Sequence, residues 1–208
     1  GYEVEQRLTA KVGGWVVSGQ PDLLTPEGVL QDWKVTSVWS FLLGEKPEWE
    51  AQLNCYAWLY GQQGVNVKRL EVVAILRDWQ NSKAGEGGYP SVPFIVKPID
   101  LWHPDDQQRY VERRVMLHKG AVEAADDELD ECTPGERWAK PDTWAVKKGA
   151  NKKASKVCTS EAEALTWIGG AHGFTIEARL GSSVRCERYC NAAPFCNQWK
   201  AMSAPSVA

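Results

Sequence analysis

Two aspartates and a lysine near the start of the chain have the types and spacing that divalent-metal chemistry requires. Asp22 closes the segment 19–22 (Gly-Gln-Pro-Asp), and the segment 32–34 (Asp-Trp-Lys) follows ten residues later. Because alternate residues of a strand share a face, Asp32 and Lys34 are expected to point to the same side of their strand. If the strand that carries Asp22 pairs with this one, Asp22 meets Asp32.

Such a trio suits the hydrolysis of phosphodiesters. Two carboxylates hold a Mg²⁺ or Mn²⁺ ion, which polarises the phosphate and lowers the pKa of a bound water. The ammonium of Lys34 would orient that water or offset the charge that builds up on the phosphate. The alternative is a solvated hairpin face with an incidental ion pair, which is the usual explanation of an isolated Asp-x-Lys. The surrounding sequence must decide between the two.

A helix expected after these strands carries Gln52 and Tyr56, which are four residues apart and so lie on one face. The succession of Gly-x-Pro-Asp, Asp-x-Lys and the run 52–59 (Gln-Leu-Asn-Cys-Tyr-Ala-Trp-Leu) resembles the RecB-type branch of the PD-(D/E)XK nuclease superfamily, over about residues 10–130. The resemblance implies that Gln52 and Tyr56 line an active site together with Asp22, Asp32 and Lys34.

The resemblance also implies a fold and an activity. The expected fold is α/β: a restriction-endonuclease-like mixed sheet flanked by helices. The expected activity is that of a Mg²⁺-dependent, exonuclease-like DNA nuclease acting in phage or bacterial recombination and processing. The branch usually has an earlier helix whose His or Glu completes the metal site. The present sequence begins after that point, and Glu3 and Glu5 are the only acids nearby.

Hydrophobic patterning agrees with the order of elements in that fold. Strands are expected at 2–10, 15–19 and 28–35, as an antiparallel meander, and Pro47 suits the first turn of a helix that ends near Gly61 and Gly64. Further strands are expected at 70–76 and 92–99, and a long amphipathic helix at about 105–127. The nuclease core is therefore predicted to span residues 1–131.

The sequence after residue 131 differs in its pattern of elements from the predicted core. Segments 144–146 and 154–157 flank a Gly/Asn turn, as a hairpin would, and Ser160 with Glu163 forms a capping box for a helix over 161–168. A strand is expected at 174–179. Residues 132–185 are thus predicted to form a small β-β-α-β insert, and residues 186–208 a cysteine-containing tail that packs on the core.

Three of the six cysteines crowd this tail, in the pattern Cys186-x₃-Cys190-x₅-Cys196. Three thiolates and one more satisfy either tetrahedral Zn²⁺ or a 4Fe–4S cluster. The segment 185–196 resembles the C-terminal cluster of AddB-type and CRISPR-adaptation nucleases, which implies 4Fe–4S held with one distant cysteine. Cys132 is the expected fourth ligand and Cys158 the second choice, whereas Cys55 is expected in the core. The alternative is reduced structural thiols.

Five lysines on the predicted hairpin have only small or polar residues between them. They could track a phosphate backbone, or they could simply keep an exposed strand edge from aggregating. The set is Lys147, Lys148, Lys152, Lys153 and Lys156. The three histidines are scattered and receive no role.

Composition and charge limit the classes of protein that fit the sequence. The net charge of −3 is not that of a strongly basic nucleic-acid binder, although acidic metal sites lower such a sum. No apolar run approaches the roughly 18 residues of a membrane span, and no signal-peptide pattern opens the sequence. The cysteines crowd the C-terminus instead of being evenly spaced as in a secreted disulfide scaffold, so a cytoplasmic protein is expected. The expected partners are DNA, with a free end or single-stranded, and proteins of recombination or replication. The alternative function is a non-catalytic DNA-binding or assembly protein; a redox or metal-storage role ranks below both.

Overall fold

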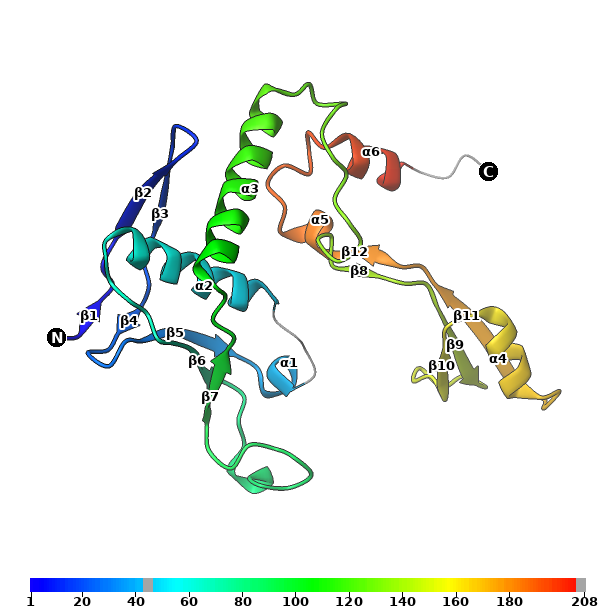
Figure 1. The fold of residues 1–208 in the computed structure, drawn as a ribbon. Coiled ribbons are helices and arrows are strands. Elements are labelled where there is room, and N and C mark those ends of the chain that lie inside the picture. Colours follow the sequence, from blue (N-terminus) through cyan, green and yellow to red (C-terminus); the bar gives the residue numbers. More distant parts are fainter. Residues whose placement is uncertain (43–46, 205–208) are drawn as a thin grey trace. The chain divides into compact units, whose positions relative to one another are not determined.

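The computed structural model describes residues 1–42 and 47–204 (Figure 1). These residues divide into two compact units, with the boundary between Val122 and Glu123. The first unit contains a mixed sheet flanked by helices, which confirms the expected α/β class. The finer boundaries at 131/132 and 185/186 stay predictions. In the described ranges no helix has the length and apolar character needed to cross a membrane.

The sheet of the first unit has five strands in the order β1-β4-β5-β6-β7. Only β5 and β6 run parallel to each other, and the other neighbours are antiparallel. A parallel pair needs a crossover between its strands, and helix α2 supplies it. The strands are β1 (Glu3–Val4), β4 (Leu23–Leu24), β5 (Val29–Thr36), β6 (Arg69–Leu76) and β7 (Phe94–Ile99), and α2 is Pro47–Gln62.

The predicted meander of three strands is wrong in its pairing. Strands β2 (Leu8–Val12) and β3 (Trp15–Gly19) form a separate hairpin around two glycines with positive φ. The antiparallel neighbour of β5 is not β3. It is β4, a two-residue strand that the sequence pattern did not predict. The expected strand 2–10 is also divided, because Glu5 has a left-handed backbone with φ of 47° between β1 and β2.

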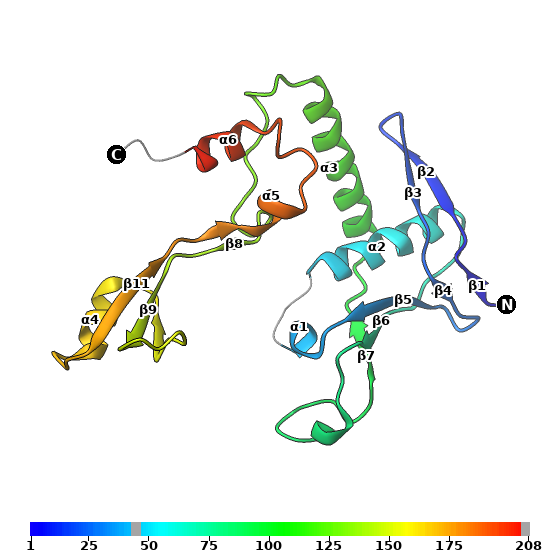
Figure 2. The ribbon, with the colours of Figure 1, turned by 180° about the vertical axis from the view of Figure 1, so that it is seen from behind.

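Helix α2 covers one face of the sheet and forms the centre of the core (Figure 2). Leu53, Ala57 and Tyr60, apolar residues at helical spacing, are all buried. Helix α3 (Pro104–Glu123) adds Val111 and Val115 to the same core and ends four residues before the predicted 127. The short helix α1 (Val38–Leu42) and a 3₁₀ turn at Asn81–Lys83 complete the unit.

The other face of β5, β6 and β7 is apolar and exposed. Register places Trp33 beside Val73 and Val96, and Val35 beside Ile75 and Phe94. Apart from Val73, which is buried, these side chains remain exposed. Since strand side chains alternate, the polar pair Asp32 and Lys34 must lie on the face that α2 covers.

A buried amide ties α2 to the segment after β7. Asn54 is fully buried, and its Nδ2 donates to the carbonyls of Glu50 and Asp100, both at 2.9 Å. Its Oδ1 accepts from the amide of Trp102 at 2.9 Å and from Nε2 of Gln107 at 3.2 Å. All of its hydrogen-bonding capacity is therefore used within the protein.

The second unit contains the predicted hairpin, helix and strand. Its main sheet has the order β10-β9-β11, and helix α4 packs on it through a core of Val146, Cys158 and Ala164. Half of the capping box is confirmed: Ser160 accepts a hydrogen bond from the Glu163 amide, whereas the Glu163 carboxylate accepts from the amide of Thr159 instead of that of Ser160. The elements are β8 (Ala139–Lys140), β9 (Thr143–Lys148), β10 (Lys156–Cys158), α4 (Glu161–Ile168), β11 (Phe174–Arg179), β12 (Ser182–Ser183), α5 (Val184–Arg188) and α6 (Asn197–Ser203).

Replacing Asn54 by leucine should destabilise the first unit strongly. The Asn54→Leu side chain has a similar volume but leaves the Asp100 carbonyl, the Trp102 amide and the Gln107 side chain without their partner. Each buried unpaired group costs about 1–3 kcal/mol, so the free energy of unfolding should fall by about 3 kcal/mol or more, measured by urea denaturation. The exposed Asn66→Leu is the control, expected within about 0.5 kcal/mol of wild type. Equal stability of the two variants would contradict the assignment.

Candidate active site

Register brings the two aspartates together. The β4–β5 pairs are Leu23 with Gln31 and Leu24 with Leu30, and the same register extended by one residue sets Asp22 opposite Asp32. Asp22 Oδ2 accepts a 2.6 Å hydrogen bond from the backbone amide of Trp33. Asp22 lies directly before β4, in the segment that connects it to β3.

Asp32 is the buried charge of the site. It is only 3% exposed, and its Oδ2 lies 2.6 Å from Nζ of Lys34. Burial raises the pKa of the Asp32 carboxyl group; the neighbouring Lys34 opposes this shift, and the charge of Asp22 adds to it. Lys34 thus offsets part of the cost of keeping Asp32 ionised away from water.

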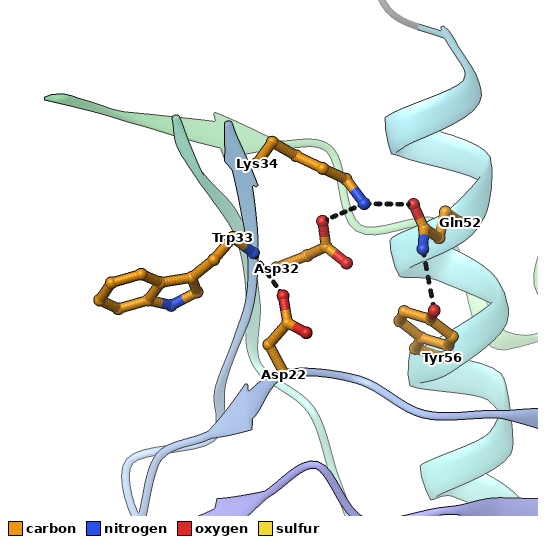
Figure 3. A network of polar contacts seen from close by, with 6 residues as sticks. All are labelled: Asp22, Asp32, Trp33, Lys34, Gln52 and Tyr56. Atoms are coloured by element: carbon orange, nitrogen blue, oxygen red, sulfur yellow. Dashed lines mark hydrogen bonds and ion pairs between the residues drawn. The ribbon is translucent and has the colours of Figure 1, made fainter. Parts of the chain in front are cut away.

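Helix α2 holds Lys34 from the other side (Figure 3). Lys34 Nζ donates to Gln52 Oε1 at 3.0 Å, and Gln52 Nε2 donates to the Tyr56 hydroxyl at 2.8 Å. The five predicted site residues thus form one polar group between the sheet and the helix, while the Trp33 side chain points away from it (Figure 3). Gln52 and Tyr56 lie where their spacing on the helix predicted.

Tyr56 packs against the hairpin at a position that only glycine allows. A Cβ atom built on Gly19 would lie 2.7 Å from the Tyr56 ring and 2.8 Å from Leu59. Real Cβ atoms do not approach so closely, so any larger residue at position 19 would push the ring away. The glycine of the Gly-x-Pro-Asp segment therefore allows α2 to approach the strand that precedes Asp22.

The donor set fits a hard divalent cation. Asp22 and Asp32 supply two facing carboxylates, and the buried Asp32 Oδ2 receives no regular hydrogen bond within the described residues, despite its ion pair with Lys34. Nowhere in the ranges 1–42 and 47–204 do three His, Cys, Asp or Glu side chains lie in position to hold a metal together. Mg²⁺ needs only one or two carboxylates, because waters and substrate phosphates complete its shell.

The two acids near the N-terminus contact the site indirectly. The amide of Glu5 donates to the carbonyl of Asp22 at 3.1 Å, which fixes the backbone around this aspartate. Glu3 instead hydrogen-bonds the side chain of the buried Tyr60, whose pKa rises to about 12 through burial and through the charge of Glu3. Glu3 is thus engaged with α2 one turn beyond Tyr56.

Of the predicted cluster cysteines, Cys186 and Cys196 lie near enough to Cys132 for their charges to act on its thiol, but in the part of the chain that the structure describes these thiols do not lie in position to hold a metal together. Partial desolvation raises the pKa of the Cys132 thiol, and the nearby charges of Glu136, Cys196 and Cys186 raise it further. Gln198 in α6 binds both the amide and the carbonyl of Cys132, at 3.0 and 2.9 Å. This contact holds residue 132 beside the start of α6, which Cys196 caps through its Sγ.

The other cysteines differ in their surroundings. Cys190 lies on the turn between α5 and α6, where its amide donates to the Arg185 carbonyl at 2.8 Å. Cys158 is buried among the apolar side chains of the α4 core, so it is a poorer fourth ligand than the exposed Cys132. Cys55 packs against the core of the first unit, as expected.

The five lysines do not form one uniform basic strip. Lys147 pairs with Glu177 on β11 at 2.5 Å, and Lys148 lies over the Phe174 ring at 5.8 Å. Because Lys147 and Lys148 are consecutive residues of one strand, they point to opposite faces. Lys152, Lys153 and Lys156 are exposed on the turn and at the start of β10.

Sequence reasoning missed two contributors to the site's framework. The Trp33 amide that binds Asp22 is a backbone group, so no side-chain pattern could identify it. Asn54 gave a weak signal, as a polar residue beside Leu53 in the buried stripe of the helix. Apart from the Glu50 carbonyl, its partners lie 46 to 53 residues away along the chain and were out of reach of local patterns.

Comparisons with known proteins add little to this geometry. The chain matches no protein-family model and no curated protein. Among solved structures it is similar to the crystal structure of SSO0001, with 19% identity over 56% of this chain and a TM-score of 0.38. The likeness spans 50% of that protein's chain and is too slight to bear on fold or function.

Two glycine substitutions test the packing around Tyr56. Gly19→Ala should lower the free energy of unfolding by about 1–3 kcal/mol, because the new methyl group overlaps the Tyr56 and Leu59 side chains. Gly61→Ala is the matched control: its Cβ meets nothing within 4 Å on α2, so it should stabilise the protein by about 0.5–1 kcal/mol. Chemical denaturation measures both, and a neutral Gly19→Ala would argue against the close contact.

Proposed function

We propose that this protein is a metal-dependent DNA nuclease that hydrolyses phosphodiester bonds in an exonuclease-like manner. The observation that carries the proposal is the convergence of Asp22, Asp32 and Lys34 with Gln52 and Tyr56 in one polar group. A buried carboxylate with a raised pKa beside a second carboxylate lowers the stability of the fold, so stability does not account for its presence. Such perturbed groups gather at functional sites.

Each residue has a distinct part in the proposed reaction. Asp22 and Asp32 would hold Mg²⁺ or Mn²⁺, which when bound supplies a polarised phosphate and an activated water. Lys34 places a fixed positive charge beside Asp32, where it can stabilise the charge that develops on the phosphate. Gln52 holds the Lys34 ammonium, and Tyr56 in turn fixes the amide of Gln52.

One observation favours a second candidate, a DNA-binding or assembly protein that does not cut. The site has two carboxylates, and within the described residues no third acidic side chain lies in position to hold a metal with them. In that case the exposed lysines of the second unit, Lys152, Lys153 and Lys156, would supply most of the affinity for DNA. Such binding weakens steeply as the salt concentration rises.

The proposal predicts that cleavage depends on the polar group and on metal. Linear single-stranded and double-stranded DNA should be degraded with Mg²⁺ or Mn²⁺, and EDTA should abolish the reaction. Asp32→Asn and Lys34→Met should each lower the cleavage rate by about 100-fold or more, since the first removes the charge of a metal ligand and the second removes the positive charge beside the reacting phosphate. Gel electrophoresis of end-labelled DNA measures the rate.

The control for these variants is Asp127→Asn, which removes an exposed carboxylate from the second unit. It should cut like wild type, and thermal melting should show that all the variants are folded. Metal-dependent cleavage that persists at the wild-type rate in Asp32→Asn would refute the site. Retention of DNA without cleavage in either metal would support the second candidate instead.

We propose further that the cysteines hold a 4Fe–4S cluster, with Zn²⁺ as the alternative. Cys132 lies near enough to Cys186 and Cys196 for their charges to act on its thiol, and Cys190 lies on the turn that connects the helices of the other two late cysteines. In the described residues these thiols do not yet share one metal position, so binding would have to draw them together. Four thiolates satisfy either group. The cluster would join the segment at 132 to the last 20 residues or so of the chain, a structural role that needs no part in cleavage.

Purification without oxygen tests this assignment. The protein should be brown, with broad visible absorption and about four iron atoms per chain by metal analysis. Cys132→Ser should lose most of the iron, whereas Cys158→Ser should keep it, because Cys158 lies in a separate core. Colourless protein with stoichiometric zinc would refute the iron–sulfur cluster, and Cys158→Ser losing the metal would refute the ligand assignment.

A further inference from the structure

A pocket of about 540 Å³ lies on the first unit, outside the polar group described above. It is lined by Trp102, Asp106, Arg109, Tyr110 and Arg113. Four of these residues follow one another at the spacing of a single face of α3, and Trp102 precedes the helix. The volume falls in the range of about 300–1,000 Å³ that is typical of small-ligand sites.

Two aromatic rings form one wall of the pocket. The rings of Trp102 and Tyr110 meet edge to face, with centroids 5.2 Å apart and planes at 63°. The indole Nε1 of Trp102 already donates to Glu50 Oε1 at 2.5 Å, so the indole is fixed and presents its ring to the pocket. Both residues are half-buried, which keeps them in place while leaving ring surface accessible.

Guanidinium groups form the other part of the lining. Arg113 lies over the Tyr110 ring at 5.8 Å, and Arg109 pairs with Asp106 one turn earlier on the helix. Two positive groups therefore accompany one carboxylate, and the pocket keeps a net positive charge. Guanidinium groups bind phosphate through paired hydrogen bonds and also stack on aromatic planes.

The pocket and the polar group lie on different sides of α2. Trp102 contacts Glu50, and Asn54 anchors the same segment, whereas Gln52 faces Lys34. Glu50 and Gln52 are two residues apart, which at 3.6 residues per turn corresponds to a rotation of about 200° around the helix axis. A ligand in the pocket would therefore leave the metal-binding carboxylates free.

We propose that this pocket is a second nucleic-acid site, which takes one base of a single strand and the phosphate beside it. Every base has a π-face, and stacking on protein rings needs a base that is not paired in a duplex. Arg113, together with Arg109 beside its partner Asp106, would bind the adjacent phosphate. The choice of ligand rests on the proposed nuclease function, and the pocket gives that function a preference for single-stranded ends.

Binding measured without metal tests the pocket separately from the chemistry. In EDTA, fluorescence anisotropy follows the full chain binding to a labelled oligothymidylate and to an abasic oligonucleotide of equal length. Tyr110→Leu should weaken oligothymidylate binding about tenfold and leave the abasic strand unchanged, since only stacking is lost. Tyr110→Phe keeps the ring and should bind both strands like wild type.

A pair of neighbouring arginines separates phosphate binding in the pocket from general electrostatic attraction. Arg113→Ala should weaken the binding of both oligonucleotides about fivefold, because each phosphate contact adds to affinity. Arg114→Ala removes the same charge one residue along α3, outside the pocket lining, and should have no more than a marginal effect. Equal losses in the two variants would overturn the site.

The remaining outcomes distinguish the pocket from the nuclease proposal. If Tyr110→Leu weakens the abasic strand as much as oligothymidylate, or weakens neither, the base-stacking site is refuted, whatever the protein cleaves. If Tyr110→Leu and Arg113→Ala behave as expected but wild type never cuts DNA, the pocket stands and the nuclease proposal fails. Circular dichroism of each variant confirms that it is folded before binding is measured.

Discussion

The Asp32 carboxylate is almost entirely buried, and an isolated ionised carboxylate in such a place would tend to take up a proton. Lys34 on the same strand lies against it and favours its charged form. The ammonium group is held in turn by Gln52, and Gln52 by Tyr56. Tyr56 reaches this position only because Gly19 has no side chain. One buried charge thus constrains β3, β5 and α2 together.

The parts of this arrangement that follow short-range rules could be predicted from the sequence. Alternation along a strand placed Asp32 and Lys34 on one face, and the helical repeat placed Gln52 and Tyr56 on another. The pairing of Asp22 with Asp32 could only be stated conditionally. It depends on β4, a strand of two residues, and so short a segment leaves no periodic pattern to detect.

In the second unit, too, contacts between residues close in the sequence could be predicted, whereas contacts between distant residues could not. The hydrogen bond from the Glu163 amide to Ser160 is a contact between residues three apart, so the pattern of Ser160 and Glu163 predicted it correctly. The choice between Cys132 and Cys158 depends on the folding of the α4 core, which spacing does not reveal. The partner of Lys147 is also distant: Glu177 lies on the neighbouring strand, 30 residues later.

The arrangement of β5, α2 and β6 determines how the site can unfold locally. Of the five polar residues, all except Asp22 belong to this strand–helix–strand unit, whose strands pair along eight residues. Such units tend to unfold and refold as single cooperative blocks. Amide hydrogens of β5 and α2 should then exchange with solvent at a common rate. A chain in which this block is open has neither Lys34 beside Asp32 nor Gln52 to hold it, so no half-assembled form of the site persists.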